Sequence, residues 1–440
     1  LAGWAGRPAA QRSGVLFGAA SWLRARRAEL AALEVLEAGK PWSEADGDIG
    51  EAIDFCEYYG RQMLDLAAGA PIESPPGERN RYAYRPKGVV AVISPWNFPL
   101  AIPMGMVAAA LVAGNTVVLK PAEQTPAIAA ALYQALEAGG LPPGALNLLP
   151  GAGEVVGAHL VANPAVAMVA FTGSLDVGLA INAAAAQRRP GQRAVKRVLA
   201  EMGGKNAIVV DGDADLDQAV PGIVYSAFGF SGQKCSACSR VVVVDAVADS
   251  LIERLAGAIE GVVIGDPVRA ETEVGPLIDA DAQTKVRGYV DAAPGQGRVV
   301  VDRQDVPGEG FYVGPCLVDR VEPSAPIARE EIFGPVLSVL RVADFDQAMA
   351  VANDTDFALT AGIYSRSPVH IALAGSALRA GNIYVNRHIT GAIPGRHPFG
   401  GFGLSGVGAK AGGPDYLLQF LDPWAVSENT MRQGFAPDLG

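Results

Sequence analysis

Cysteine and histidine are scarce in this sequence, with four of each among 440 residues. So few cysteines argue against the disulfide framework of a secreted domain, and they favour the reducing cytoplasm as the location of the protein. The histidines also lack the H-x3-H and H-E-x-x-H spacings that zinc sites use. We therefore expect a cytoplasmic protein that uses no metal.

Basic residues are also fewer than acidic ones. The chain has 35 basic and 46 acidic residues, which gives a formal net charge of -11 at pH 7. This balance argues against a nucleic-acid partner or an anionic membrane surface, and it favours a small-molecule substrate. No basic segment followed by an apolar core opens the chain, so we expect no signal peptide.

The stretch 100–119 contains no charged residue and is long enough to suggest a membrane span. Its proline, glycine and asparagine residues favour another interpretation. Pro103 lies near its start, and Gly114 with Asn115 precedes a β-branched run. The stretch therefore predicts a helix, a turn and a buried strand inside a globular domain, and no membrane contact.

What the chain does contain is an alternation of apolar strands and helices. Its length predicts two or more domains. From residue 87 the predicted strands are continuous apolar runs, as in a parallel sheet covered on both faces. These strands are 89–93, 116–119, 145–149 and 166–171, and the helices lie near 99–113, 124–138, 152–162 and 175–186. The pattern predicts an α/β fold with a Rossmann-like, doubly wound dinucleotide-binding layout.

A second α/β series begins near Asn206 and continues to about residue 400. It opens with a strand at 207–210, a helix at 214–228, a strand at 240–245 and a helix at 247–260. We interpret this series as a second domain. The first 60 residues are predicted to be helical.

The segment 232–240, with the sequence GQKCSACSR, places Cys235 after a glycine turn and before an apolar strand. A thiolate there could attack a carbonyl carbon, although an unpaired cysteine is more often a small buried apolar residue. Cys235 and Cys238 also form a C-x-x-C pair, which leaves open a redox dithiol or half of a zinc site. Oxidation to a Cys235–Cys238 disulfide would be a reversible way to silence the nucleophile.

Two further segments have the chemistry of a nucleotide site. The strand that ends at Phe171 runs into Gly173 and Ser174 before a helix, where backbone N–H groups could hold a pyrophosphate or the serine could simply cap the helix. Lys120 and Glu123 follow another parallel strand and could bind ribose hydroxyls. A carboxylate at that place would repel a 2′-phosphate, so Glu123 favours NAD over NADP without excluding NADP.

Asn97 and Glu201 are candidates for the groups that assist a nucleophile. The amide of Asn97 could donate to an oxyanion, although an asparagine in such a segment is more often a turn residue. Glu201 lies beside Gly203 and Gly204, where a carboxylate could activate water. A lone glutamate would normally lie on the surface.

Together these segments resemble the aldehyde dehydrogenase superfamily, from about residue 10 to the C-terminus. The matching strings, in the family's order and spacing, are PWNFP, LKPAEQTP, FTGS, EMGGKN, GQKCSA, EEIFGPV and PFGGFGLSG. The resemblance implies a domain of residues 1–204 with N-terminal helices, NAD binding and a flap hairpin near 79–86. A catalytic domain of residues 205–400 would follow. Residues 401–440 would return to the NAD domain and supply an oligomerisation tail.

The resemblance also implies roles for individual residues. Cys235 would be the nucleophile, Glu201 the base for hydrolysis of the acyl-enzyme, and Asn97 with the Cys235 N–H the oxyanion hole. The implied NAD-binding residues are Ser94, Pro95, Trp96, Lys120, Glu123, Gly153, Gly173, Ser174, Gly203, Glu331 and Phe333.

Within the superfamily the chain most resembles the members that oxidise L-glutamate γ-semialdehyde in proline catabolism. The stretches that carry this narrower likeness are GQKCSACSR, NRHITGAIPGRHPFGGFGLSG and VSENTMRQGFAPDLG. Ser236, Gly391 and Ala392 would then bind the α-amino-carboxylate end of the substrate, and Phe399 would contact its aliphatic part. Glu57 and Lys234 are expected to form a pair near the site.

Two alternatives remain. One is another semialdehyde dehydrogenase, such as one for succinate semialdehyde, and the other is an inactive NAD-binding homologue. Family members carry several tens of residues ahead of the position of Leu1, and we expect their absence here to affect folding and NAD affinity more than the chemistry. The segment 79–85 and the C-terminal tail resemble the family's assembly flaps, which predicts a homodimer or a larger homo-oligomer.

Overall fold

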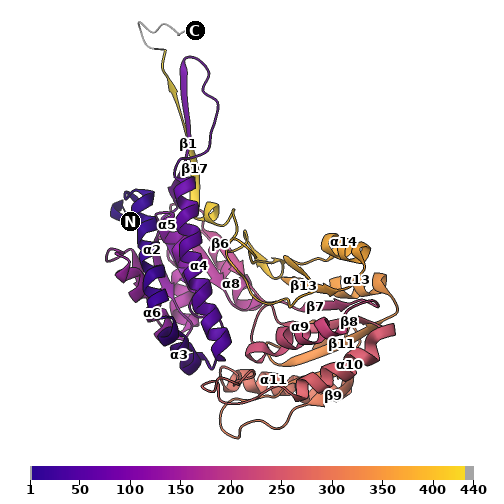
Figure 1. Cartoon of the computed structure of the whole chain (residues 1–440). Coiled ribbons are helices and arrows are strands. Elements are labelled where there is room, and N and C mark those ends of the chain that lie inside the picture. Colours follow the sequence, from indigo (N-terminus) through magenta and orange to yellow (C-terminus); the bar gives the residue numbers. More distant parts are fainter. Residues whose placement is uncertain (1, 432–440) are drawn as a thin grey trace.

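The computed structural model describes residues 2–431, which fold around two β-sheets (Figure 1). The first sheet has six strands in the order β16-β6-β5-β2-β3-β4. All its neighbours are parallel except β16, which runs antiparallel to β6. In chain order its strands are β2 (Val89–Ile93), β3 (Thr116–Lys120), β4 (Leu146–Leu148), β5 (Val166–Thr172), β6 (Arg197–Glu201) and β16 (Gly406–Val407).

Helices cover this sheet on both faces, and the N-terminal helices gather at the left of Figure 1. They are α1 (Ala2–Ala5), α2 (Ala9–Ala25), α3 (Arg27–Ala38), α4 (Trp42–Leu66), α5 (Ala101–Val112), α6 (Pro126–Ala138), a π-helical turn (Gly153–Gly157), α7 (Ala158–Ala162) and α8 (Leu175–Ala185). Helix α5 packs on α4 and on two strands, which explains why it carries no charge. Within residues 2–431 no helix is both long and apolar enough to cross a membrane.

The chain passes to the second sheet between β6 and β7. This sheet has seven strands in the order β14-β13-β7-β8-β11-β10-β9, and only β9 pairs antiparallel. Its strands are β7 (Asn206–Val210), β8 (Cys238–Val244), β9 (Arg298–Asp302), β10 (Cys316–Asp319), β11 (Val336–Val342), β13 (Thr360–Tyr364) and β14 (Asn382–Val385).

The helices around the second sheet form separate apolar cores with its two faces. These helices are α9 (Leu216–Phe228), α10 (Asp245–Glu260), α11 (Ala280–Ala292), α12 (Pro326–Arg329), α13 (Phe345–Asn353) and α14 (Pro368–Ala377). Short 3-10 turns lie at Gly229–Gly232, Ala293–Gly295 and Leu417–Phe420. A small antiparallel pair joins β12 (Phe357–Ala358) to β15 (Phe402–Gly403).

A long two-stranded ribbon projects from the body of the molecule at the top of Figure 1. Residues near 79–86, where we expected a hairpin, form the single strand β1 (Glu78–Pro86). Its antiparallel partner is β17 (Leu421–Asn429), from the other end of the chain. The end of the subfamily-like sequence VSENTMRQGFAPDLG, residues 432–440, lies outside the described residues.

The α/β class and the parallel layout predicted from the sequence are confirmed. Each strand and helix expected between residues 87 and 260 is present, with ends that differ by at most two residues. The helix expected at 152–162 begins with the π-helical turn and continues as α7.

Candidate active site

Cys235 lies at the end of an unusual turn between α9 and β8. Phe230, Ser231 and Gly232 have φ angles of 54°, 56° and 69°, which are left-handed values that side chains rarely adopt. The Ser231 hydroxyl donates to the Gly275 carbonyl at 2.8 Å and so helps to hold the turn. A Cβ at Gly232 would lie 2.4 Å from the Gly334 carbonyl oxygen, so the turn requires glycine there. The turn presents Cys235 to open space while its neighbours stay buried.

Two cavities share Cys235. The larger one has a volume of about 290 Å³ and lies between the carboxyl ends of the first sheet and helix α11. The smaller one, of about 60 Å³, lies between α4, α5 and the loop 392–411. Thr172, Met202 and Ile102 also line both, so Cys235 lies where the two cavities meet.

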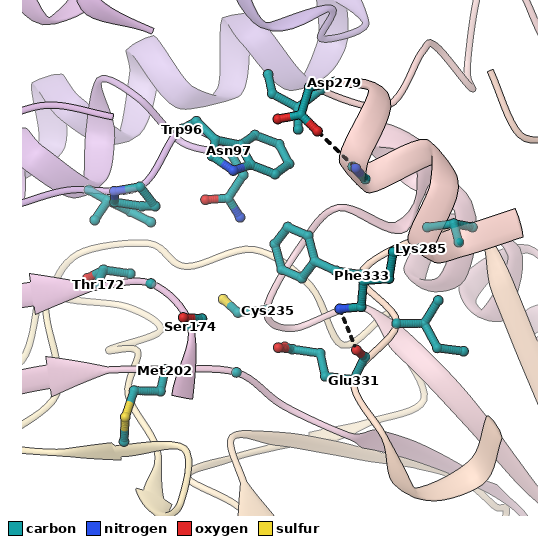
Figure 2. A pocket seen from close by; sticks show the side chains of 18 residues that line it. Trp96, Asn97, Thr172, Ser174, Met202, Cys235, Asp279, Lys285, Glu331 and Phe333 are labelled. Atoms are coloured by element: carbon teal, nitrogen blue, oxygen red, sulfur yellow. Dashed lines mark hydrogen bonds between the residues drawn. The ribbon is translucent and has the colours of Figure 1, made fainter. Parts of the chain in front are cut away.

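The larger cavity gathers most of the residues predicted to bind a dinucleotide (Figure 2). Those that line it are Pro95, Trp96, Gly173, Ser174, Gly203, Glu331 and Phe333, with Asn97 and Cys235. Ser174 also caps α8, because its hydroxyl accepts from the Val177 N–H at 3.4 Å. The rings of Trp96 and Phe333 meet edge to face, 5.6 Å apart. The cavity therefore has an aromatic wall and a helix N-terminus, which suit a flat ring and a phosphate.

Lys120, Glu123 and Gly153 form a separate cluster at the ends of the neighbouring strands β3 and β4. The Lys120 ammonium is 2.7 Å from the Glu123 carboxylate. A Cβ at Gly153 would lie 3.6 Å from that carboxylate and 3.9 Å from the ammonium, so all three residues are adjacent. Ser94 ties the neighbouring strand β2 to this cluster, because its N–H donates to the Lys120 carbonyl at 3.2 Å. The cluster offers a donor and an acceptor of the kind that ribose hydroxyls need.

Glu331 reaches across the larger cavity toward Gly203 and Gly204. Its carboxylate accepts from the Gly204 N–H at 2.9 Å. A Cβ at Gly203 would lie 2.4 Å from the same carboxylate, so the glycine leaves room for it. Burial raises the pKa of Glu331, and the Gly204 N–H opposes that rise. Lys285, on α11, holds this loop by donating to the Glu331 carbonyl at 2.9 Å (Figure 2).

Two hydrogen-bond donors lie beside the Cys235 thiol. Asn97 is buried, and its Oδ1 accepts from the Phe98 N–H at 3.2 Å while its Nδ2 donates to the Gln233 carbonyl at 3.1 Å. This arrangement fixes the orientation of the amide and leaves its second N–H for another acceptor. The Cys235 N–H is the second donor. An oxyanion beside the thiol would meet both.

Glu201 lines the smaller cavity with Cys235. The Gly401 N–H donates to its carboxylate at 3.2 Å. Burial raises the pKa of Glu201 to about 8, and burial with the charges of Glu331 and Glu201 raises the pKa of Cys235 to about 12. Cys235 is therefore a thiol at neutral pH, and Glu201 lies in the same cavity with a pKa close to neutral.

The residues expected to bind substrate divide into two groups. Ala392 and Phe399 line the smaller cavity. Ser236 and Gly391 are next to its lining residues Cys235 and Ala392 in the chain, and Gly391 has a left-handed φ of 93°. The loop that carries Gly391, Ala392 and Phe399 follows β14 of the second sheet and leads to β16 of the first sheet.

The predicted pairing of Glu57 with Lys234 is wrong. Lys234 forms a buried ion pair with Glu44 at 2.6 Å. Glu57 instead pairs with Arg24 at 2.7 Å and with Arg61 at 2.8 Å on the outer side of α4. Lys234 thus fastens the nucleophile loop to the start of α4, and Glu57 belongs to a surface network.

Sequence reasoning missed several residues of the smaller cavity. These are Glu51 and Phe55 on α4, Met106 on α5, and Tyr416. Glu51 is notable because no other described residue donates a hydrogen bond to its carboxylate or pairs with it. Burial, with help from Asp48, raises its pKa to about 8. Because α4 carries seven acidic residues, nothing in the sequence singles out Glu51.

Cys238 does not share this environment with Cys235. Its side chain is buried in the core of the second sheet, and its thiol donates to the Arg240 carbonyl at 3.4 Å. Burial raises its pKa to about 12. A Cys235–Cys238 disulfide would require Cys238 to leave this core, so the structure gives the redox hypothesis no support.

Comparisons with known proteins agree with this architecture. The model of the aldehyde dehydrogenase family matches residues 1–426. The 1-pyrroline-5-carboxylate dehydrogenase of Geobacillus thermodenitrificans is 49% identical over 425 residues, which are 97% of this chain and 82% of the relative.

Two solved structures are also similar. A 1-pyrroline-5-carboxylate dehydrogenase from Thermus with bound NAD has a TM-score of 0.95 at 45% identity, over 97% of this chain and 83% of that one. Proline utilization A from Bdellovibrio bacteriovorus has a TM-score of 0.97 at 49% identity. The match covers 99% of this chain but only 45% of that longer protein. With a family match over nearly its whole length and relatives of this similarity, the chain belongs to the aldehyde dehydrogenase family.

Proposed function

We propose that this protein oxidises the aldehyde group of L-glutamate γ-semialdehyde to a carboxylate and uses NAD as the hydride acceptor. The observation that carries the proposal is the position of Cys235, which is shared by a large cavity suited to a dinucleotide and a small one that contains Glu201 and Glu51. The names of the similar dehydrogenases, and the NAD bound in one of them, support the same substrate and cofactor.

The residues of the larger cavity and of the separate cluster at Lys120 and Glu123 fit NAD. Lys120 and Glu123 would hold the adenosine ribose, and the α8 N-terminus at Ser174 would face the pyrophosphate. Glu331 and Phe333 would hold the nicotinamide ribose and ring, because the space at Gly203 already admits the Glu331 carboxylate. When bound, NAD accepts the hydride that leaves the substrate carbon.

The side chains of the smaller cavity then divide the remaining work. The sulfur of Cys235 adds to the aldehyde carbon, and the thiol proton passes to Glu201, the carboxylate in the same cavity. Asn97 and the Cys235 N–H hold the oxyanion that forms. After oxidation the acyl group remains on sulfur as a thioester. Glu201, again ionised, takes a proton from water as the water attacks the thioester, and the cysteine sulfur leaves.

Glu51 supplies a reason to prefer an amino-bearing substrate. Its carboxylate faces the small cavity and lacks a cationic partner among the described residues, whereas Phe399 offers an apolar wall. An α-ammonium group would form an ion pair with Glu51. The backbone N–H groups of Gly391 and Ala392 donate to no other residue in the described part of the chain, and they suit the α-carboxylate of the same substrate.

The initial rate of NAD reduction tests the proposal, with L-glutamate γ-semialdehyde beside succinate semialdehyde and with Cys235→Ala as the control. We expect a strong preference for glutamate semialdehyde, lost in the variant. Equal rates with succinate semialdehyde would contradict the assignment of Glu51, and a folded parent inactive on all aldehydes would contradict the enzymatic function.

We also propose that the β1–β17 ribbon joins two copies of the chain. The ribbon extends away from the body (Figure 1), and arginines 81 and 85 stack on Trp424 along it. Aromatic and arginine side chains of this kind are enriched in protein interfaces. Light scattering during size-exclusion chromatography would measure the mass, and a monomer at micromolar concentration would contradict the proposal.

A further inference from the structure

Lys410 lies close enough to Glu201 for the two charges to interact, but it does not line the small cavity that Glu201 shares with Cys235. It is half-buried, and its ammonium donates to the Gly400 carbonyl at 2.8 Å and to the Asn382 Oδ1 at 2.9 Å. A third bond goes to the Gly381 carbonyl. The three bonds of the ammonium thus fasten the Gly400 peptide to the start of β14, at Gly381 and Asn382.

One of these bonds connects Lys410 with the proposed base. The Gly400 carbonyl, which accepts from Lys410, belongs to the same peptide group as the Gly401 N–H, which donates to Glu201. Because a peptide group is a delocalised unit, a cation on its oxygen makes its N–H a stronger donor. The ammonium and the carboxylate therefore act on each other through one peptide as well as through space.

Glycine at position 400 makes this contact possible. A Cβ there would lie 2.9 Å from the Glu201 carboxylate and 3.3 Å from the Lys410 Cα. A larger residue would separate the lysine, the peptide and the carboxylate. The close approach is thus built into the backbone.

We propose that Lys410 is a positioning residue that holds Glu201 in place and favours its ionised form through the peptide group between Gly400 and Gly401. The inference rests on the proposed role of Glu201 in hydrolysing the acyl-enzyme. It adds Lys410 to the residues that influence hydrolysis of the acyl-enzyme, although Lys410 touches neither substrate nor cofactor.

The charges around Glu201 agree with this role. Burial raises its pKa, whereas the Gly401 N–H and the charge of Lys410 lower it. The other titratable groups of the cavity are Cys235, Glu51 and Tyr416, which would all be negative if ionised. Lys410 is therefore the charge that opposes burial. Removing it raises the pKa of Glu201, so less carboxylate is ionised at neutral pH.

An activated ester tests this inference without NAD or an aldehyde. The thiol proton of Cys235 passes to Glu201 as the sulfur attacks the acetyl carbon of 4-nitrophenyl acetate, and 4-nitrophenolate leaves; Glu201 then releases this proton to solvent. Water then attacks the thioester, a proton passes to Glu201, and the sulfur leaves as acetate forms. The burst of nitrophenolate measures acylation, and the steady rate after it measures hydrolysis. A parent that hydrolyses the ester but does not oxidise glutamate semialdehyde would refute the proposed substrate and not this inference.

The steady rate is measured against pH for the parent, Lys410→Gln, Lys410→Met and Lys410→Arg. Both neutral variants should move the midpoint up by about one pH unit and lower the rate at pH 7 about tenfold. Lys410→Arg, which keeps the charge, should restore the parent midpoint.

Lys196 provides a matched control, since its ammonium also donates to two carbonyls, of Val161 and Asn163, but far from Glu201. Lys196→Met should lower thermal stability and leave the midpoint unchanged. If folded Lys410→Gln or Lys410→Met also keeps the parent midpoint, the role of Lys410 is merely structural and the inference is wrong.

Discussion

The two cavities that meet at Cys235 are built in different ways. Nearly half of the lining of the larger one lies at the ends of the parallel strands β2, β5 and β6, as Asn97, Gly173 and Gly203 do. The smaller one is assembled from α4, α5, the β6 end and the loop 392–411, which are far apart in the chain. The sheet therefore supplies one wall of the first cavity, whereas the second depends on how separate units meet.

The difference suggests how the protein divides its tasks. A dinucleotide site at strand ends needs backbone groups and glycines, which the sheet topology supplies. Recognition of one small substrate needs particular side chains, and these come from elements that can change without altering the sheet. Glu201 is the link, because it ends a strand of the first sheet yet faces the small cavity.

Removing the carboxylate of Glu201 should have the largest effect on the reaction rate. Glu201→Gln keeps the size of the side chain but cannot accept a proton, so hydrolysis of the acyl-enzyme should fall about a hundredfold or more. Because the pKa of Glu201 is about 8, the parent rate should rise with pH up to that value, and the variant should lose this rise. Stopped-flow measurement of NADH would separate the first turnover from the steady rate. An unchanged steady rate would remove Glu201 from the mechanism.

A smaller effect is expected from a change confined to the small cavity. Glu51→Gln should raise KM for glutamate semialdehyde about tenfold, because an ion pair with the α-ammonium is lost. KM for succinate semialdehyde, which has no amino group, should stay the same. In the parent, KM for the amino substrate should fall as the pH rises toward 8, where Glu51 becomes ionised.

Glu57→Gln is the control for this experiment, since it makes the same change on the same helix but at the surface pairs with Arg24 and Arg61. Its KM values should equal those of the parent, and its stability should change by about 0.5 kcal/mol or less. Equal effects of the two variants would show that Glu51 acts only through the helix.

The smallest effect is expected from the separate cluster of Lys120, Glu123 and Gly153 at the ends of β3 and β4. Glu123→Gln should raise KM for NAD a few-fold and lower KM for NADP, since a carboxylate no longer repels the 2′-phosphate. Glu123 is 46% exposed, so solvent weakens its contribution. KM for the aldehyde and the rate of ester hydrolysis should not change. If KM for the aldehyde rose as well, the two cavities would not be independent.

Local sequence was enough to predict the cavity residues that lie in short distinctive segments, and not those that packing alone brings to the site. Cys235, Asn97 and Glu331 lie in short segments whose glycines, prolines and neighbouring strands carry the signal. Glu51 and Tyr416 do not lie in such segments. The sequence of α4 is typical of an ordinary helix, and only the packing of the folded chain places the Glu51 face of this helix toward Cys235.

The error over Lys234 has the same origin. Glu44 and Glu57 are both on α4, and being 13 residues apart they point about 220° away from each other around the helix. Sequence alone does not say which of the two faces the nucleophile loop. The pairing of β1 with β17 could not be predicted from local sequence either, because the two strands lie more than 300 residues apart in the chain.

The return of the chain to its first sheet has a consequence for synthesis on the ribosome. Strand β16 and the segment that ends at Leu421 complete the first sheet and its core only after the whole second sheet has been made. The Asn115 side chain, just before β3, can donate its hydrogen bond to the Phe420 carbonyl only after residue 420 has been made. In the same way, the Tyr59 hydroxyl can accept from the Gly412 N–H only after residue 412 has been made. The first sheet is thus completed after the second, and its exposed strand edge must be kept from other chains until residues 406–421 have been made.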